Sequence, residues 1–194
     1  MKQQAAELPI IFFESQSAFE GWLNTNATTA PGVWLQLAKK NSGIASISYD
    51  EAVESALCYG WIDSQGKSFD DKTWIQKYTP RGKKSIWSKV NKEKAEVLLT
   101  NGRMTPAGLQ AIELAKQNGN WDKAYEPQST ASLPEDFVAM LENNAKAKAF
   151  YDSLNSRNKY AILFRLQHAS KLETRLKRMQ QFLEMLEKGE KIYP

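Results

Sequence analysis

Most of the residues best suited to bind a ligand lie in one segment, residues 56–94. Asp63 stands beside large aromatic side chains in a predicted strand, and a carboxylate in such a place needs a charged or hydrogen-bonding partner if it is buried. Arg81, in a proline-containing turn, and Lys67 are the obvious partners. We therefore expect Asp63 to be at least partly buried and hydrogen-bonded to Arg81, or to donors near residues 85–88.

This segment has two interpretations. In the structural one, a buried Asp63–Arg81 pair fixes a hairpin against the following helix. In the functional one, the segment forms a pocket for an anion or another small ligand, with tryptophan walls and with hydroxyl groups at a helix N-terminus, whose backbone N–H groups favour anions. The candidate ligand-binding residues are Trp61, Asp63, Arg81, Ser85, Trp87, Ser88, Asn91 and Arg103.

Neither the single cysteine nor the single histidine predicts nucleophilic catalysis. Cys58 lies in the last turn of a predicted helix, where the negative end of the helix dipole disfavours a thiolate, and we expect it to be buried and inert. His168 has no sequence feature that ties it to Cys58. Residues 63–66, DSQG, lack the nucleophile-elbow pattern, and the sequence has no phosphate-binding glycine loop and no metal-ligand motif. We therefore expect no catalytic residue, no metal and no cofactor.

The composition is that of a globular protein. The 194 residues are 42% hydrophobic and 25% charged, which excludes a disordered or fibrous chain. A single cysteine excludes a disulfide framework and fits a reducing compartment. The apolar run of residues 8–13 is too short for a signal peptide, and no segment approaches the roughly 20 apolar residues of a membrane span. We expect a cytoplasmic protein without membrane insertion.

Apolar periodicity predicts a small sheet in the first part of the chain. Residues 33–40 alternate with period two, and the segments on either side of Asp70 and Asp71 are typical of a hairpin with an acidic turn. Residues 10–13 add a short edge strand. We therefore expect an antiparallel sheet of three or four strands, packed by helices.

Helical signals surround this sheet and then dominate. Ser17 with Glu20, and Ser48 with Glu51, are predicted capping boxes, and only helices are predicted from Ser85 onward. The predicted fold class is therefore α+β with a helical C-terminal region. The predicted organisation is a core domain over residues 1–119, a connector over residues 120–132 and a helical region over residues 133–194 that packs on the core.

Basic side chains concentrate in residues 72–103. Nine lysines and arginines against two glutamates give this segment a charge of +7, whereas the whole chain carries +4. A positive surface raises encounter rates with an anionic partner, and a solvated lysine-rich helix is the structural alternative. If the segment forms one positive face, Val90, Val97 and Leu98 should point inward.

Three sequence blocks carry a family resemblance. EAVESALCYGWIDS at 51–64, YTPRGKKSIWSKVNKEKAEVLLTNGRMTPAGLQAIELAKQNGNW at 78–121 and RLQHASKLETRLKRMQQFLEMLEKGEK at 165–191 resemble the YdeI/OmpD-associated family, also called bacteriocin-protection proteins. The resemblance implies a bacterial protein linked to resistance to bacteriocins or antimicrobial peptides, without an established active site. We do not carry over the porin partner in the family's name, because the sequence shows no export signal. The residues at the family's closing motif are Ala169, Ser170, Glu173, Thr174 and Arg175.

These observations leave three functions open. The first, which the resemblance implies, is a non-catalytic cytoplasmic binding or stress-protection protein. The second is nucleic-acid binding through residues 72–103, where Trp74 and Trp87 could stack on bases. The third is an enzyme that acts on a small anionic substrate at Asp63 and Arg81. The expected class of partner is thus an anionic small molecule or a nucleic acid.

Overall fold

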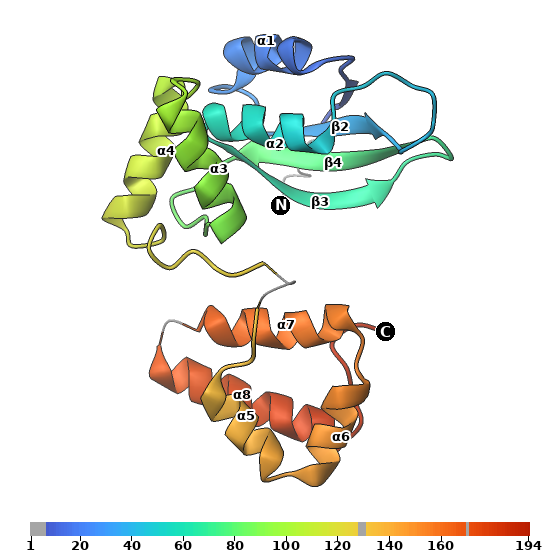
Figure 1. Cartoon of the computed structure of the whole chain (residues 1–194), viewed down its shortest axis with the longest axis vertical. Helices are drawn as coiled ribbons and strands as arrows, with labels where there is room; N and C mark the ends of the chain where they lie inside the picture. Colours follow the sequence, from blue (N-terminus) through green and yellow to red (C-terminus); the bar gives the residue numbers. More distant parts are fainter. Residues whose placement is uncertain (1–6, 128–130, 170) are drawn as a thin grey trace, which may run out of the picture. The chain divides into compact units, whose positions relative to one another are not determined.

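The computed structural model describes residues 7–127, 131–169 and 171–194. The chain divides into two compact units, residues 1–124 and 125–194. In the described residues, the first unit holds four strands and four helices, and the second holds four helices (Figure 1). The predicted α+β class with a helical C-terminal region is confirmed.

The sheet of the first unit is mixed. Its strands are β1 (Ile10–Phe12), β2 (Val33–Ala38), β3 (Trp61–Ser68) and β4 (Thr73–Pro80), in the order β1-β2-β4-β3. β2, β4 and β3 pair antiparallel, as predicted, whereas β1 pairs parallel with β2. The connection explains this pairing, because the helix α1 (Gln16–Asn26) carries the chain back between β1 and β2, and such a crossover joins parallel strands.

The hairpin between β3 and β4 has the predicted acidic turn. The Asp70 carboxylate accepts hydrogen bonds from the backbone N–H groups of Lys72, at 2.8 Å, and Thr73, at 2.7 Å. An aspartate that satisfies backbone donors two and three residues ahead stabilises a tight turn. The turn therefore fixes where β4 begins.

The other helices of the first unit are α2 (Tyr49–Cys58), α3 (Lys89–Thr100) and α4 (Pro106–Gln117). The capping box of α2 is confirmed: the Glu51 N–H donates to the Ser48 hydroxyl, and the Ser48 N–H donates to the Glu51 carboxylate. The capping box predicted at Ser17 is wrong. α1 begins earlier, because the Ser15 hydroxyl accepts the N–H of Ala18.

The core of the first unit lies between the sheet and the helices α1 and α2 (Figure 1). Alternate residues of β2, namely Val33, Leu35 and Leu37, are at most 1% exposed, as the period-two pattern predicts. Phe19 and Leu23 of α1 belong to the same buried cluster. The inward face of the sheet is thus fixed by local alternation.

The end of α2 and the start of α4 approach each other closely. Thr105 donates both its N–H, at 3.1 Å, and its hydroxyl, at 2.7 Å, to the Cys58 carbonyl oxygen. Gly108 faces the same carbonyl, and a Cβ atom there would overlap it. Gly60 has a φ of 71°, so its left-handed conformation turns the chain from α2 into β3. α4 is thereby held beside the ends of β3 and β4.

The predicted burial of Cys58 is confirmed. Its side chain is 2% exposed, and this burial raises the pKa of the thiol to about 11, although the nearby Arg103 charge acts in the opposite direction. The thiol is therefore protonated at neutral pH.

The second unit is a small helical bundle. Its helices are α5 (Glu135–Glu142), α6 (Ala145–Ser153), α7 (Ser156–Gln167) and α8 (Leu172–Glu187). Phe137, Ile162, Leu166 and Leu186 form the fully buried centre of its core. Ser170, part of the closing motif, lies outside the described residues. In the described part of the chain, no helix is both long and apolar enough to cross a membrane.

Candidate functional site

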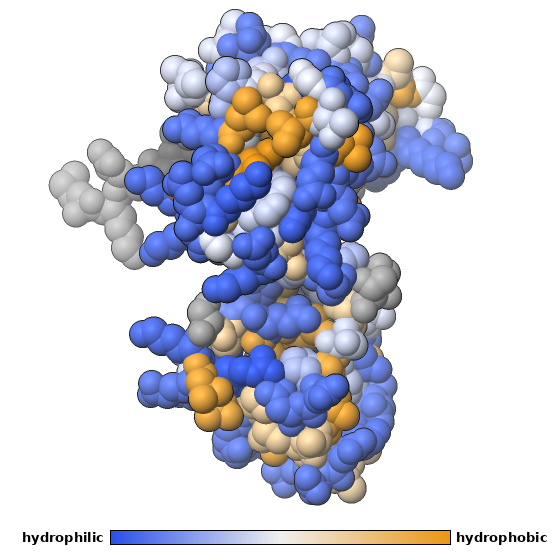
Figure 2. All heavy atoms as spheres, turned by 60° about the vertical axis from the view of Figure 1, so that its left-hand side comes forward, coloured by the Kyte–Doolittle hydropathy of each residue, from blue (hydrophilic) through white to orange (hydrophobic). Residues whose placement is uncertain are grey.

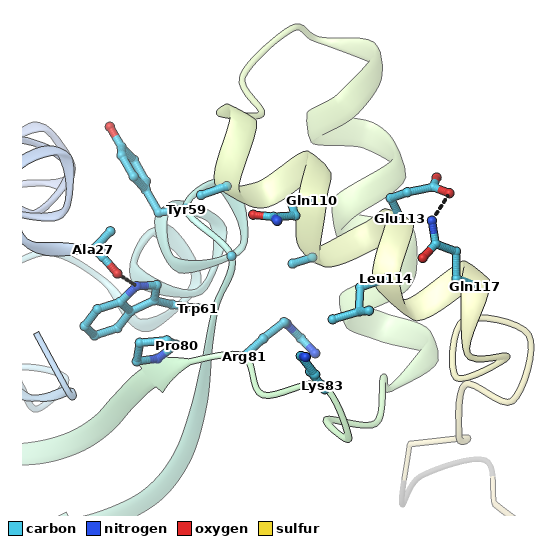
Figure 3. A pocket seen from close by; sticks show the side chains of 13 residues that line it. Ala27, Tyr59, Trp61, Pro80, Arg81, Lys83, Gln110, Glu113, Leu114 and Gln117 are labelled. Atoms are coloured by element: carbon cyan, nitrogen blue, oxygen red, sulfur yellow. Dashed lines mark hydrogen bonds between the residues drawn. The ribbon is translucent and has the colours of Figure 1, made fainter. Parts of the chain in front are cut away.

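A cavity of about 440 Å3 opens in the first unit (Figure 3). It lies between the end of α2, the adjoining ends of β3 and β4, and one side of α4. It combines apolar walls with two basic side chains. The lining residues are Ala27, Tyr59, Gly60, Trp61, Pro80, Arg81, Lys83, Ala107, Gln110, Ala111, Glu113, Leu114 and Gln117.

Trp61 is a fixed wall of this cavity. It is 1% exposed, its indole N–H donates to the Ala27 carbonyl at 3.0 Å, and its ring meets the Trp22 ring edge-on, with centroids 5.8 Å apart. The cross-strand register places Pro80 of β4 opposite Trp61. This wall is therefore rigid, and the ligand would meet a preformed surface.

Arg81 is held at the cavity by its backbone and its side chain. Its N–H donates to the Gly60 carbonyl at 2.9 Å, which ties it to the turn after α2. Its guanidinium lies 3.6 Å from the centroid of the Trp87 ring, and Nη1 donates to the Ile86 carbonyl at 3.4 Å. Figure 3 shows the side chain reaching from the end of β4 toward α4. Stacking on an indole fixes the position of the charge.

The charge of the cavity is positive. Arg81 and Lys83 are its cations and Glu113 is its carboxylate, which accepts a hydrogen bond from Gln117 at 3.0 Å (Figure 3). The Lys83 carbonyl accepts a hydrogen bond from Asn118 at 2.9 Å, so the lysine is anchored beside the end of α4. An anion that carries an apolar part is the ligand that suits these walls and charges.

Ser85 and Trp87 line a smaller hollow of about 20 Å3 that shares Arg81 and Lys83 with the cavity. The Ser85 hydroxyl accepts the Gly82 N–H at 3.0 Å and so closes the turn after β4. Of the predicted set, the structure thus brings Trp61, Arg81, Ser85 and Trp87 together.

Asp63 lies on β3, half-buried as expected, but its predicted partners are wrong. Its carboxylate accepts hydrogen bonds from the Tyr49 hydroxyl at 2.8 Å and from the Gln76 amide at 3.2 Å. The strand register is the cause, because it pairs Asp63 with Tyr78 and places its carboxylate where Tyr49 of α2 and Gln76 of β4 reach it. Asp63 does not line the cavity.

The remaining predicted residues have structural partners away from the cavity. Ser88 is the N-cap of α3 and accepts the Asn91 N–H at 3.1 Å. Arg103 forms ion pairs of 2.9 Å with both Glu20 and Glu54. The two ion pairs of Arg103 join α1, α2 and the segment before α4.

The prediction that residues 72–103 form one positive face is wrong. Arg103 and Lys94 pair with carboxylates of the first 71 residues. Leu98 is buried, but Val90 and Val97 are 41% and 58% exposed. Figure 2 shows apolar surface on the side of the first unit that carries α3 and α4. The basic side chains are therefore interleaved with acidic and apolar ones.

The sequence does not predict the side of the cavity that α4 forms. Gln110 and Leu114 lie about thirty residues after Arg81 in the chain, in a helix whose sequence pattern indicates only packing against the core. Lys83 could have been predicted as a site residue, since it lies in the same turn as the candidate Arg81. Among the described residues, no group of three or more histidine, cysteine, aspartate or glutamate residues could hold a metal ion.

Comparison with known protein families gives two matches, one for each unit. The model of a domain of unknown function, DUF8412, matches residues 11–111, just over half of the chain. The model described as bacteriocin-protection, YdeI or OmpD-associated matches residues 130–189, which contain most of the closing block. The block at 51–64 and most of the block at 78–121 fall in the first match. Neither a curated protein nor a solved structure gives a significant match.

Proposed function

We propose that the chain, which belongs to the DUF8412 family through residues 11–111 and whose residues 130–189 match the model described as bacteriocin-protection, YdeI or OmpD-associated, has a bacteriocin-protection-related role. In this role it is a binding protein rather than an enzyme, and its ligand is a small organic anion held in the cavity of the first unit. We also propose that the protein is located in the cytoplasm.

One observation carries the choice of ligand: Arg81, stacked on Trp87, stands with Lys83 at a cavity of about 440 Å3 that has Trp61 as a wall. Small-molecule pockets commonly measure roughly 300–1,000 Å3 and combine apolar walls with a few fixed polar groups. The positive charges of Arg81 and Lys83 attract an anion, and the exposed Lys83 ammonium can donate charge-assisted hydrogen bonds to it. The size, walls and charge of the cavity therefore fit a small anion with an apolar part.

The geometry favours a small anion over a nucleic acid. Trp87 is 2% exposed, Arg81 covers one face of its ring, and the Trp121 ring packs against it in a T-shaped contact with centroids 4.8 Å apart. A base needs an exposed ring face to stack on. Trp87 offers none.

Titration calorimetry with citrate, succinate and inorganic phosphate tests this function. We expect citrate to bind, and Lys83→Gln to weaken that binding about tenfold, because the substitution removes a charge-assisted hydrogen bond. Lys40→Gln, on an exposed lysine of the same unit outside the cavity, should leave it unchanged. Loss of affinity in both variants, or in neither, would contradict a ligand site in this cavity.

A further inference from the structure

The second unit has a groove of its own along α7. Its volume is about 410 Å3, and it is lined by Arg157, Tyr160, Ala161, Phe164, Arg165 and Tyr193. Five of these residues follow the helical spacing of three, one, three and one, which places them on a single face of α7. The groove is therefore built on a rigid element, with Tyr193 as its other side.

A buried asparagine fixes the position of Tyr193. Asn158 is 1% exposed, its amide donates to the Tyr193 carbonyl at 3.2 Å, and its side-chain oxygen accepts the Tyr193 N–H at 2.9 Å. Asn158 is itself oriented by Asn155, the N-cap of α7. Two backbone hydrogen bonds from a buried side chain hold the segment after α8 against α7, so the tyrosine ring is held in place.

Two guanidinium groups flank this ring. The Arg157 and Arg165 guanidinium carbons lie 4.3 Å and 5.8 Å from the centroid of the Tyr193 ring. Arg165 also donates to the Ala161 carbonyl at 3.1 Å. In the described part of the chain, neither arginine forms an ion pair with a carboxylate, and none of the residues that line the groove is acidic. The groove therefore presents two positive charges beside three aromatic rings.

We propose that this groove binds a small anion that carries an aromatic ring. The two guanidinium groups hold the anionic end through paired hydrogen bonds. The Tyr160, Phe164 and Tyr193 rings contact the aromatic part, for which offset or edge-on ring contacts are favourable. This site is distinct from the cavity of the first unit, and the proposal does not depend on the function proposed for that cavity.

Phenyl phosphate is a suitable probe because it combines both features, and inorganic phosphate and phenol each carry one of them. In calorimetric titrations of the full chain, we expect phenyl phosphate to bind at least about tenfold more tightly than inorganic phosphate or phenol. Arg157 is exposed, so Arg157→Gln should leave the fold unchanged, as a thermal melt would show, yet weaken phenyl phosphate binding about tenfold.

Two controls locate the binding. Lys177→Gln removes an exposed charge of the same unit outside the groove, and Lys83→Gln removes a charge from the cavity of the first unit. Lys177→Gln should bind phenyl phosphate as the unmodified protein does. Lys83→Gln should keep the binding that Arg157→Gln weakens, whatever it loses at the cavity of the first unit. The proposal is overturned if phenyl phosphate fails to bind, if inorganic phosphate or phenol binds equally well, or if Arg157→Gln has no effect.

Discussion

Gly108→Ala should lower the thermal unfolding midpoint of the first unit by about 10 °C, the largest effect that we expect from a single methyl group. Its Cβ would overlap the Cys58 carbonyl oxygen, which already accepts two hydrogen bonds from Thr105. Neither helix end can move without breaking these bonds, and overpacking of this kind costs about 3 kcal/mol. Tryptophan fluorescence measures the effect, because all six tryptophans belong to residues 1–124.

Gly21→Ala is the matched control. Gly21 lies inside α1, and a Cβ there would meet nothing within 4 Å. Alanine should therefore stabilise the same unit by about 0.5–1 kcal/mol, because it lowers the entropy of the unfolded chain and favours helix. An unchanged midpoint for Gly108→Ala would contradict the close approach of α2 and α4, and with it the shape of the cavity.

Arg175→Ala should destabilise the second unit by about 2 kcal/mol and leave the tryptophan signal unchanged. Arg175 Nε and Nη2 donate to the two oxygens of Asp136 at 3.0 Å and 2.7 Å, and Nη1 donates to the Leu166 carbonyl at 3.1 Å. One side chain thus joins the first turn of α5, the end of α7 and the start of α8. Circular dichroism at the helix band measures the loss.

The same variant should change the acid stability of the second unit. The hydrogen bond from Arg175 lowers the pKa of Asp136 below its ordinary value. A lowered pKa in the folded state stabilises the fold above the unfolded pKa, and this contribution is lost as the pH falls through the folded pKa. We therefore expect the destabilisation by Arg175→Ala to shrink below about pH 4.

Lys148→Ala is the comparison for this effect. It removes an exposed ion pair of 3.1 Å with Asp152 on the surface of α6. This loss should change the free energy of unfolding of the second unit by less than about 0.5 kcal/mol. Equal effects of the two substitutions, or an Arg175→Ala effect that is constant from pH 7 to pH 3, would contradict the role given to Arg175.

Local signals predicted the elements because they need only neighbouring residues. The alternation in β2 and the capping box of Ser48 and Glu51 act within one strand or one helical turn, and both are present in the structure. The parallel pairing of β1 depends on the path of α1 across the sheet, which local patterns do not encode.

The contacts of the site depend on register and docking, which the sequence does not contain. Alternation shows that Asp63 faces one side of the sheet, but only the register brings Gln76 and Tyr49 to it. Likewise, helical periodicity marks Val97 of α3 and Leu176 of α8 as apolar positions, yet both are more than half exposed, because each helix packs along a narrower stripe than the pattern suggests.

The most direct test of the anion cavity is a citrate titration followed by the indole N–H signals of the tryptophans in nitrogen-15 NMR spectra. Trp61 is a wall of the cavity, and its indole N–H is bonded to Ala27 at its edge. Trp34 is a control, because it lies under Lys67, with a nitrogen-to-centroid distance of 4.7 Å, and does not line the cavity. We predict a saturable shift of the Trp61 signal and a constant Trp34 signal. A Trp61 signal that stays in place at saturating citrate would contradict the account.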